Sequence, residues 1–110
     1  MMRQAYLSGP YSAATDALIL INLQRVLRAA LRLTKAGWLT VIPHCSMSHE
    51  TDWPSALLKD KLLLRELNIK RDAIIMLPGW EDSRGSRQEK QWAEEMGLPV
   101  LLYEEALHVE

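Results

Sequence analysis

One short stretch of the sequence gathers residues that could do chemistry. Between Pro78 and Glu89 it reads PGWEDSRGSRQE, with two serines, two glycines and two arginines before the final glutamate. Hydroxyl groups, a glycine and the free N–H groups of a helix start can together bind an anion or a hydroxyl group. A solvated turn has the same composition, so both interpretations stay open on these residues alone.

Glu89 itself has two possible roles. Residues 86–89 fit the S-x-x-E capping box, in which Ser86 caps the helix and Glu89 reaches back to it. Glu89 also begins a stripe at three- and four-residue spacing, whose other members are Trp92, Ala93 and Met96. Because that stripe should face the core, we expect Glu89 to point inward, beside the positive end of the helix dipole. A partly desolvated carboxylate in that place suits a nucleophile, and the two roles can coexist.

Two other segments carry candidate side chains. Residues 8–12, SGPYS, end an apolar run where doubly wound folds often bind a ligand, but they lack the G-x-G-x-x-G fingerprint of dinucleotide sites.

His44, Cys45 and His49 match no standard zinc spacing, so we expect no metal. Adjacent residues of an extended chain point to opposite sides, which argues against a His44–Cys45 pair. We predict that His44 lines the pocket and hydrogen-bonds a ligand.

Two aspartates complete the set of candidates. Asp72 directly precedes an apolar run, so we expect it at the amino end of a strand, as a turn or cap residue away from the site. Asp60 lies inside a predicted helix, at the edge of a leucine stripe that includes Leu64 and Leu67. A carboxylate in that position is more often a solvated surface residue than a catalytic acid.

The elements that position these residues alternate between strand and helix. Apolar runs predict strands at 5–7, 39–42, 73–77 and 99–103, and helical patterns fall at 16–36, about 52–67 and 87–96. A short helix or tail follows the last strand. In the first helix, Gly37 is expected just past the end. The residues expected on its core-facing side are Leu20, Leu23, Leu27, Ala30 and Leu31.

The strands predict a parallel sheet. They lack polar alternation, which is typical of parallel strands covered on both faces. The alternating order implies right-handed crossovers and a small three-layer α/β fold. Ligands of such folds bind beyond the carboxyl ends of the strands. We therefore expect the segments 8–12, 43–46 and 78–89 to converge in space.

Composition limits the classes of protein to consider. The 110 residues suit a single domain spanning 1–110, with 48% hydrophobic and 25% charged residues. A net charge of −1 argues against nucleic-acid binding. There is no apolar run of the ~20 residues that a membrane span needs, and no signal-peptide pattern at the N-terminus. Cys45 has no cysteine partner, so we predict a cytoplasmic protein without internal disulfides and without a membrane partner.

Four segments together resemble a known family. YLSGPYS, VIPH, DAIIMLPGWEDSRGSRQE and GLPV are similar to the nucleoside 2-deoxyribosyltransferase-like superfamily, above all to its small, mostly uncharacterised bacterial and phage members. The similarity runs from Tyr6 to about Tyr103, and LPGW-x-x-S-x-G-x-x-x-E is its most specific part. The resemblance implies a flavodoxin-like three-layer sandwich with a parallel sheet of four to five strands. It also implies a homodimer or larger homo-oligomer, and a reaction without metal or organic cofactor.

Characterised relatives are nucleoside deoxyribosyltransferases and nucleoside 5′-monophosphate N-glycosidases, which cleave the N-glycosidic bond through a glutamate. By this resemblance Glu89 matches the nucleophile, Ser83 matches a residue that contacts sugar or phosphate, and Gly85 matches the loop glycine. His44 matches a histidine of some nucleotide hydrolases. The full predicted substrate-binding set is Tyr6, Ser8, Gly9, Pro10, Tyr11, His44, Trp80, Ser83, Gly85 and Ser86.

The chain departs from the family pattern at Leu64. Many relatives carry there an aspartate that is thought to assist the leaving base or to orient the sugar. Asp60, one helical turn earlier, is our predicted second catalytic residue, with Glu66 as the other possible substitute. The first loop also lacks an arginine that helps some relatives to hold a 5′-phosphate, and Arg84 or Arg87 could supply that charge.

The resemblance therefore implies cleavage or transfer of an N-glycosidic bond on a nucleoside or nucleoside 5′-monophosphate. A catalytically inactive nucleotide-binding or sensing module is the alternative that Leu64 suggests. A structural or partner-binding α/β domain is the alternative that the capping box suggests.

Overall fold

The sheet has four parallel strands in the order β2-β1-β3-β4. The computed structural model describes residues 2–11, 13–43 and 53–108. The elements are β1 (Gln4–Ser8), α1 (Asp16–Lys35), β2 (Leu39–Val41), α2 (Trp53–Arg65), β3 (Ala73–Met76), the 3-10 turn η2 (Trp80–Asp82), α3 (Arg84–Met96), β4 (Val100–Leu102) and α4 (Tyr103–Leu107). This parallel sheet with its helices confirms the α/β prediction and is consistent with a flavodoxin-like sandwich.

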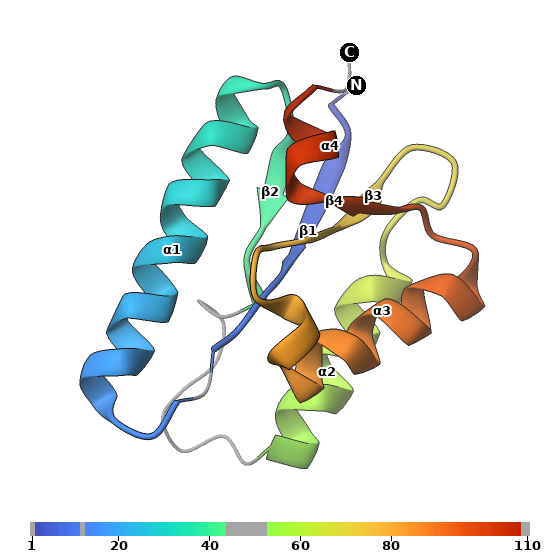
Figure 1. Cartoon of the computed structure of the whole chain (residues 1–110). Coiled ribbons are helices and arrows are strands. Elements are labelled where there is room, and N and C mark those ends of the chain that lie inside the picture. The colour runs from blue at the N-terminus through green and yellow to red at the C-terminus, as the bar shows by residue number, and fades with distance from the viewer. Residues whose placement is uncertain (1, 12, 44–52, 109–110) are drawn as a thin grey trace.

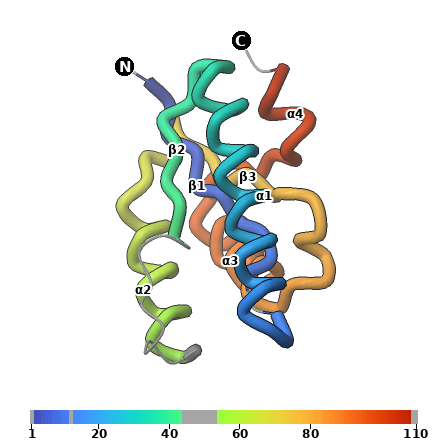
Figure 2. The backbone as a smooth tube through the Cα atoms, turned by 90° about the vertical axis from the view of Figure 1, so that its left-hand side faces the viewer, coloured from blue at the N-terminus to red at the C-terminus, as the bar shows by residue number. Residues whose placement is uncertain are grey.

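The helices form a layer on each side of the sheet. Helices α1 and α4 pack on one face, and α2 and α3 pack on the other (Figures 1 and 2). The chain leaves β1 for β2 on one side, then crosses back to β3 on the other. The strand order therefore reverses between β1 and β3, and the carboxyl ends of these two strands flank the expected ligand position.

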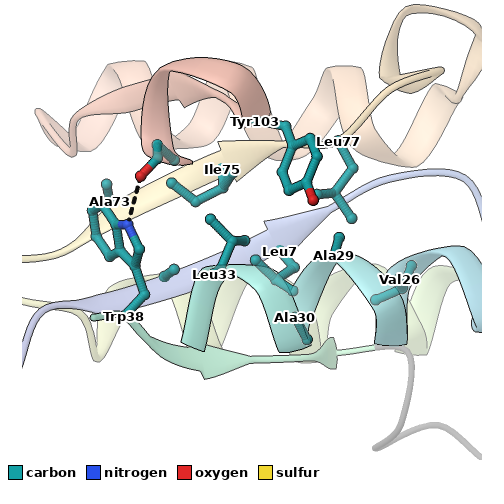
Figure 3. Close-up of a cluster of buried hydrophobic side chains, with 12 residues drawn as sticks. Leu7, Val26, Ala29, Ala30, Leu33, Trp38, Ala73, Ile75, Leu77 and Tyr103 are labelled. Atoms are coloured by element: carbon teal, nitrogen blue, oxygen red, sulfur yellow. Dashed lines mark hydrogen bonds between the residues drawn. The ribbon is translucent and has the colours of Figure 1, made fainter. Parts of the chain in front are cut away.

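Alternation along β1 separates core residues from site residues. Ala5 and Leu7 enter the cluster under α1 and α4, which is drawn in Figure 3. Tyr6 joins the opposite cluster under α2 and α3, and Ser8 faces the same side, where its hydroxyl contacts α3. Since side chains of a strand alternate between the faces, Tyr6 and Ser8 reach the same helix from two residues apart.

The core-facing side of α1 differs from the prediction. Val26, Ala29, Ala30 and Leu33 are the buried residues of this helix (Figure 3). Ala30 was expected there, but Leu20, Leu27 and Leu31 are exposed, so the predicted face is wrong for these three leucines. The helix carries two apolar rows, and the row with two alanines lies against the sheet, where small side chains allow a close approach. Gly37 follows α1 with φ 104°, as its predicted position requires.

The start of α3 corrects the predicted capping box. The helix begins at Arg84, three residues before the predicted start, and Ser83 is its N-cap. The Ser83 hydroxyl accepts a hydrogen bond from the Ser86 backbone N–H at 3.2 Å. Ser86 is therefore inside the first turn, and Glu89 is too far along the helix to serve as the capping glutamate. Glu89 makes its contacts elsewhere.

Asp72 ties the amino ends of two neighbouring strands together. Its carboxylate accepts hydrogen bonds from the backbone N–H groups of Gln4 and Asn68, each at 2.8 Å, and pairs with Arg71 at 3.0 Å. Burial raises the pKa of Asp72, but these hydrogen bonds outweigh it and leave the pKa below its usual value. The prediction of a turn residue away from the site is confirmed.

No helix among residues 2–11, 13–43 and 53–108 combines the length and the hydropathy that a bilayer crossing needs.

Candidate active site

A cavity of about 280 Å³ opens at the carboxyl ends of β1 and β3. This volume lies near the lower end of the ~300–1,000 Å³ that is typical of small-molecule sites. Four parts of the described chain form its wall: the loop after β1, Pro43 just after β2, the inner side of α2, and the segment from η2 into α3. The described lining residues are Gly9, Pro10, Tyr11, Pro43, Ala56, Leu57, Asp60, Asp82, Ser83, Arg84, Gly85, Ser86 and Glu89.

Glu89 lies at the base of this cavity and is only 5% exposed. The Tyr6 hydroxyl donates a short hydrogen bond to Glu89 Oε2. The Ser8 hydroxyl donates to Oε1 at 2.8 Å. Each carboxylate oxygen thus has its own donor, and both donors come from one strand. This arrangement fixes the orientation of the carboxylate and stabilises its ionised form.

Asp60 brings a second carboxyl to the same cavity from α2. Its Oδ1 atom is buried and has no hydrogen-bond partner among the described residues. Burial raises the pKa of Asp60 to about 6. A carboxyl whose buried oxygen lacks a donor is stabilised by holding a proton, so Asp60 is suited to donate one.

The two carboxyls influence each other. Burial raises the pKa of Glu89 to about 8, the negative charge of Asp60 adds to this effect, and the hydroxyls of Tyr6 and Ser8 oppose it. The pair therefore titrates with values of about 6 and about 8, and holds one proton between them. The deeper burial of Glu89 favours the proton on Glu89, whereas its two hydroxyl donors and the unpartnered Asp60 Oδ1 favour the proton on Asp60. A nucleophilic role for Glu89 requires the second placement. Burial also raises the pKa of Tyr6, which keeps its hydroxyl protonated as a donor.

The first turn of α3 adds polar groups to the wall. Ser86 is almost fully buried, and its hydroxyl oxygen has no hydrogen-bond partner among the described residues. A Cβ atom added at Gly85 would meet nothing within 4 Å, so the cavity is open beside this residue. Gly9 differs, because a Cβ there would come within 3.0 Å of the Leu77 side chain. Gly9 therefore permits the close packing of the two loops that carry the site.

Most of the residues predicted from the sequence meet in this place. The predicted residues that line the cavity are Gly9, Pro10, Tyr11, Asp60, Ser83, Gly85, Ser86 and Glu89. Tyr6 and Ser8 lie beneath the lining and contact Glu89. Trp80 is outside the lining: it packs against the cluster under α2 and α3, with the Lys90 ammonium 5.6 Å from its ring. The prediction for His44 falls outside the described residues.

Neither of the two other positions considered near α2, Leu64 and Glu66, presents an acid to the cavity. Leu64 is 1% exposed and belongs to the core, so this position presents nothing to the cavity. Glu66 is exposed and does not line the cavity. Arg84 lines it, whereas the Arg87 guanidinium donates to the backbone oxygen of Glu81 at 2.7 Å.

Sequence reasoning missed part of the lining. Pro43, Ala56, Leu57 and Asp82 were not among the predicted site residues. Asp82 directly precedes Ser83 in the same loop, and that adjacency was a usable signal. Ala56 and Leu57 gave none, because small and apolar side chains on a helix indicate a core position in any sequence.

Comparison with known proteins supplies a family for this arrangement. A family model described as a domain of unknown function, DUF4406, matches residues 3–102. The chain belongs to the DUF4406 family. All the lining residues of this DUF4406 domain fall inside the matched range. No curated protein matches the chain.

Proposed function

We propose that this DUF4406 domain cleaves or transfers the N-glycosidic bond of a nucleoside or nucleoside 5′-monophosphate. The observation that carries the proposal is the placement of Glu89. A buried carboxylate faces the cavity with both oxygens held by Tyr6 and Ser8, and Asp60 lies beside it. Glycoside cleavage uses such a pair of carboxyl groups in different protonation states. The resemblance of the Pro78–Glu89 segment to nucleoside 2-deoxyribosyltransferase-like enzymes supports the same reaction.

The first step forms a covalent intermediate. An oxygen of ionised Glu89 attacks the anomeric carbon of the sugar, and the bond from that carbon to the base nitrogen breaks. The bonding electrons leave with the base, which takes a proton from Asp60. The carboxylate of Glu89 is then esterified to the sugar, and Asp60 is ionised.

The second step releases the enzyme. Water attacks the anomeric carbon while Asp60 takes one of its protons, and the bond to Glu89 breaks. The free sugar leaves and the starting protonation states return. In a transferase a second base takes the place of water. Hydrolysis and transfer therefore need the same two residues and differ only in the acceptor.

A trapping experiment tests this mechanism. The protein is incubated with each nucleoside and nucleoside monophosphate, quenched in acid and analysed by intact mass and peptide mapping. We expect a mass increase of one ribosyl or deoxyribosyl group on Glu89, which includes the 5′-phosphate when the substrate is a nucleoside monophosphate. Glu94→Gln, on the exposed face of the same helix, serves as control and should carry the same adduct. An adduct on another residue, or base release without any adduct under rapid quench, contradicts the proposal.

The alternative is an inactive nucleotide-binding module, which the buried Leu64 favours. That module would gain thermal stability from nucleosides without releasing base from them. Measuring both properties on one sample separates the alternatives, because an enzyme of the proposed kind releases base from the ligand that stabilises it.

A further inference from the structure

Among the described residues, two buried side-chain atoms that line the cavity lack a hydrogen-bond partner. They are Asp60 Oδ1 and the hydroxyl oxygen of Ser86. Native proteins satisfy nearly all of their buried polar groups, because an unpartnered group destabilises the folded state. The proposed reaction gives Asp60 a task, the transfer of a proton to the leaving base, but gives none to Ser86. The Ser86 hydroxyl therefore calls for a partner on the substrate.

Ser86 lies one helical turn before the nucleophile. Residues three apart share one side of a helix, with their Cβ atoms about 5–6 Å apart, and both Ser86 and Glu89 line the cavity. The Ser86 backbone N–H is already bound to the Ser83 hydroxyl at 3.2 Å, so the Ser86 side chain is the group left for a ligand. The space beside Gly85 is open and leaves room for one. A substrate group held by Ser86 is therefore close to the carbon that Glu89 attacks.

The stereochemistry of the reaction identifies that substrate group. Glu89 displaces the base from the anomeric carbon, so it approaches the face of the sugar opposite the base. In the common nucleosides, which are β-anomers, that face carries the 2′- and 3′-hydroxyls of ribose. The 2′-hydroxyl is on the carbon next to the anomeric carbon, and Ser86 meets this face from the same side of α3 as Glu89. Two hydroxyls can donate to and accept from each other, so each satisfies the other.

We propose that the Ser86 hydroxyl binds the 2′-hydroxyl of the substrate and thereby selects ribonucleosides over 2′-deoxyribonucleosides. The inference rests on the proposed N-glycosidic cleavage and names its sugar. A deoxyribonucleoside leaves the buried Ser86 hydroxyl unpartnered, and a site built to bind a substrate hydroxyl rejects the analogue that lacks it. Hydrogen bonds to the 2-hydroxyl of a sugar also strengthen in the transition state of glycoside cleavage. The contact therefore contributes to the rate as well as to binding.

Three sugars on the same base test the contact. Base release is measured for a ribonucleoside, its 2′-deoxy analogue and its arabino epimer, whose 2′-hydroxyl keeps its electron-withdrawing effect but lies on the face of the base. Ser86→Ala should lower kcat/KM about 10–100-fold for the ribonucleoside. The two other sugars should change by less than about twofold. Ser55→Ala, an exposed change outside the cavity lining, is the matched control and should change none of the three.

Thermal unfolding of the free protein separates a binding role from a structural one. The Ser86 hydroxyl has no partner to lose among the described residues, so Ser86→Ala should keep or raise the Tm. A clear fall in the Tm would assign the hydroxyl to the fold and overturn the proposal. An equal loss of kcat/KM for all three sugars overturns it too. A loss confined to 5′-monophosphates, whichever sugar they carry, would assign Ser86 to the phosphate and also overturn it.

Calorimetry on Glu89→Gln distinguishes failure of this inference from failure of the proposed reaction. The probes are the four common ribonucleosides and their 2′-deoxy counterparts. We expect tighter binding of a ribonucleoside, and loss of that preference in the double variant Glu89→Gln with Ser86→Ala. Such a preference without base release by the wild type would contradict the reaction but support the Ser86 contact. Base release with no difference between the two sugars would support the reaction and overturn the contact, and absence of both binding and release would overturn both.

Discussion

Glu89 owes its environment to two residues of a single strand. Tyr6 and Ser8 each donate a hydrogen bond to one of its oxygens and thereby oppose the rise in pKa that burial causes. Asp60 lies in the same cavity, but its Oδ1 atom is buried without a hydrogen-bond partner among the described residues. Two carboxyls in one cavity are thereby made chemically different, which is what an acid and a nucleophile require.

The pH dependence of the reaction follows from this pair. We expect a bell-shaped profile of kcat/KM, with limbs near pH 6 and pH 8. Below the lower limb Glu89 is protonated and cannot attack, so the rate rises as the pH rises through it. Above the upper limb the proton of Asp60 is lost and the base has no donor.

Asp60→Asn separates the two limbs. The variant should lose about 10²–10⁴-fold in kcat/KM and lose the fall at high pH, since no acid remains to titrate. Its remaining limb should stay near pH 6, because Asp60 is already neutral where Glu89 titrates and asparagine keeps that site neutral. Glu66→Gln, an exposed change just after the same helix, should keep the full bell. An unchanged high-pH limb in Asp60→Asn would show that another group is the acid.

Among the elements, the first turn of α3 determines which polar groups line this side of the cavity. Ser83 caps the helix, and this cap directs the following residues into the wall of the cavity. On the opposite edge of the sheet, Asp72 connects the start of β1 with the loop that leads to β3. The same carboxylate thus aligns the two central strands whose carboxyl ends carry the site.

Asp72→Asn tests that connection. The substitution replaces one acceptor oxygen by an NH2 group, which faces a backbone N–H and cannot accept a hydrogen bond from it. A hydrogen bond to a charged group contributes about 1.5–3 kcal/mol to stability. We expect the free energy of unfolding to fall by that amount in urea denaturation at neutral pH. Since the pKa of Asp72 is lowered, the difference from wild type should shrink as the pH falls through that pKa. Glu66→Gln should change stability by less than about 0.5 kcal/mol, and an equally small effect of Asp72→Asn would rule out the connection.

For the whole molecule, the order of elements was predictable from the sequence. Apolar runs without alternation indicated parallel strands, and the carboxyl ends of those strands do carry the cavity. The inward direction of Glu89 followed from its stripe with Ala93, which is fully buried. These features depend on local periodicity, which a single sequence expresses directly.

Other features depended on tertiary packing and were not predictable. The capping box at residue 86 was a valid local pattern, but Ser83 offered an earlier cap and the helix began there. Helix α1 had two apolar rows, and periodicity alone could not tell which one would face the sheet. Asp60 reaches the cavity because α2 packs beside α3; the family resemblance pointed to this residue, but the spacing of its helix alone favoured a solvated surface position.

Release of free base tests the central claim most directly. Wild type and Glu89→Gln are incubated with ribo- and deoxyribonucleosides and their 5′-monophosphates, and free base is measured by chromatography. We predict release by the wild type from at least one of these substrates, and a loss of at least about 10⁴-fold in folded Glu89→Gln. Release at a near wild-type rate by folded Glu89→Gln, or no release by the wild type from any substrate, would contradict the account.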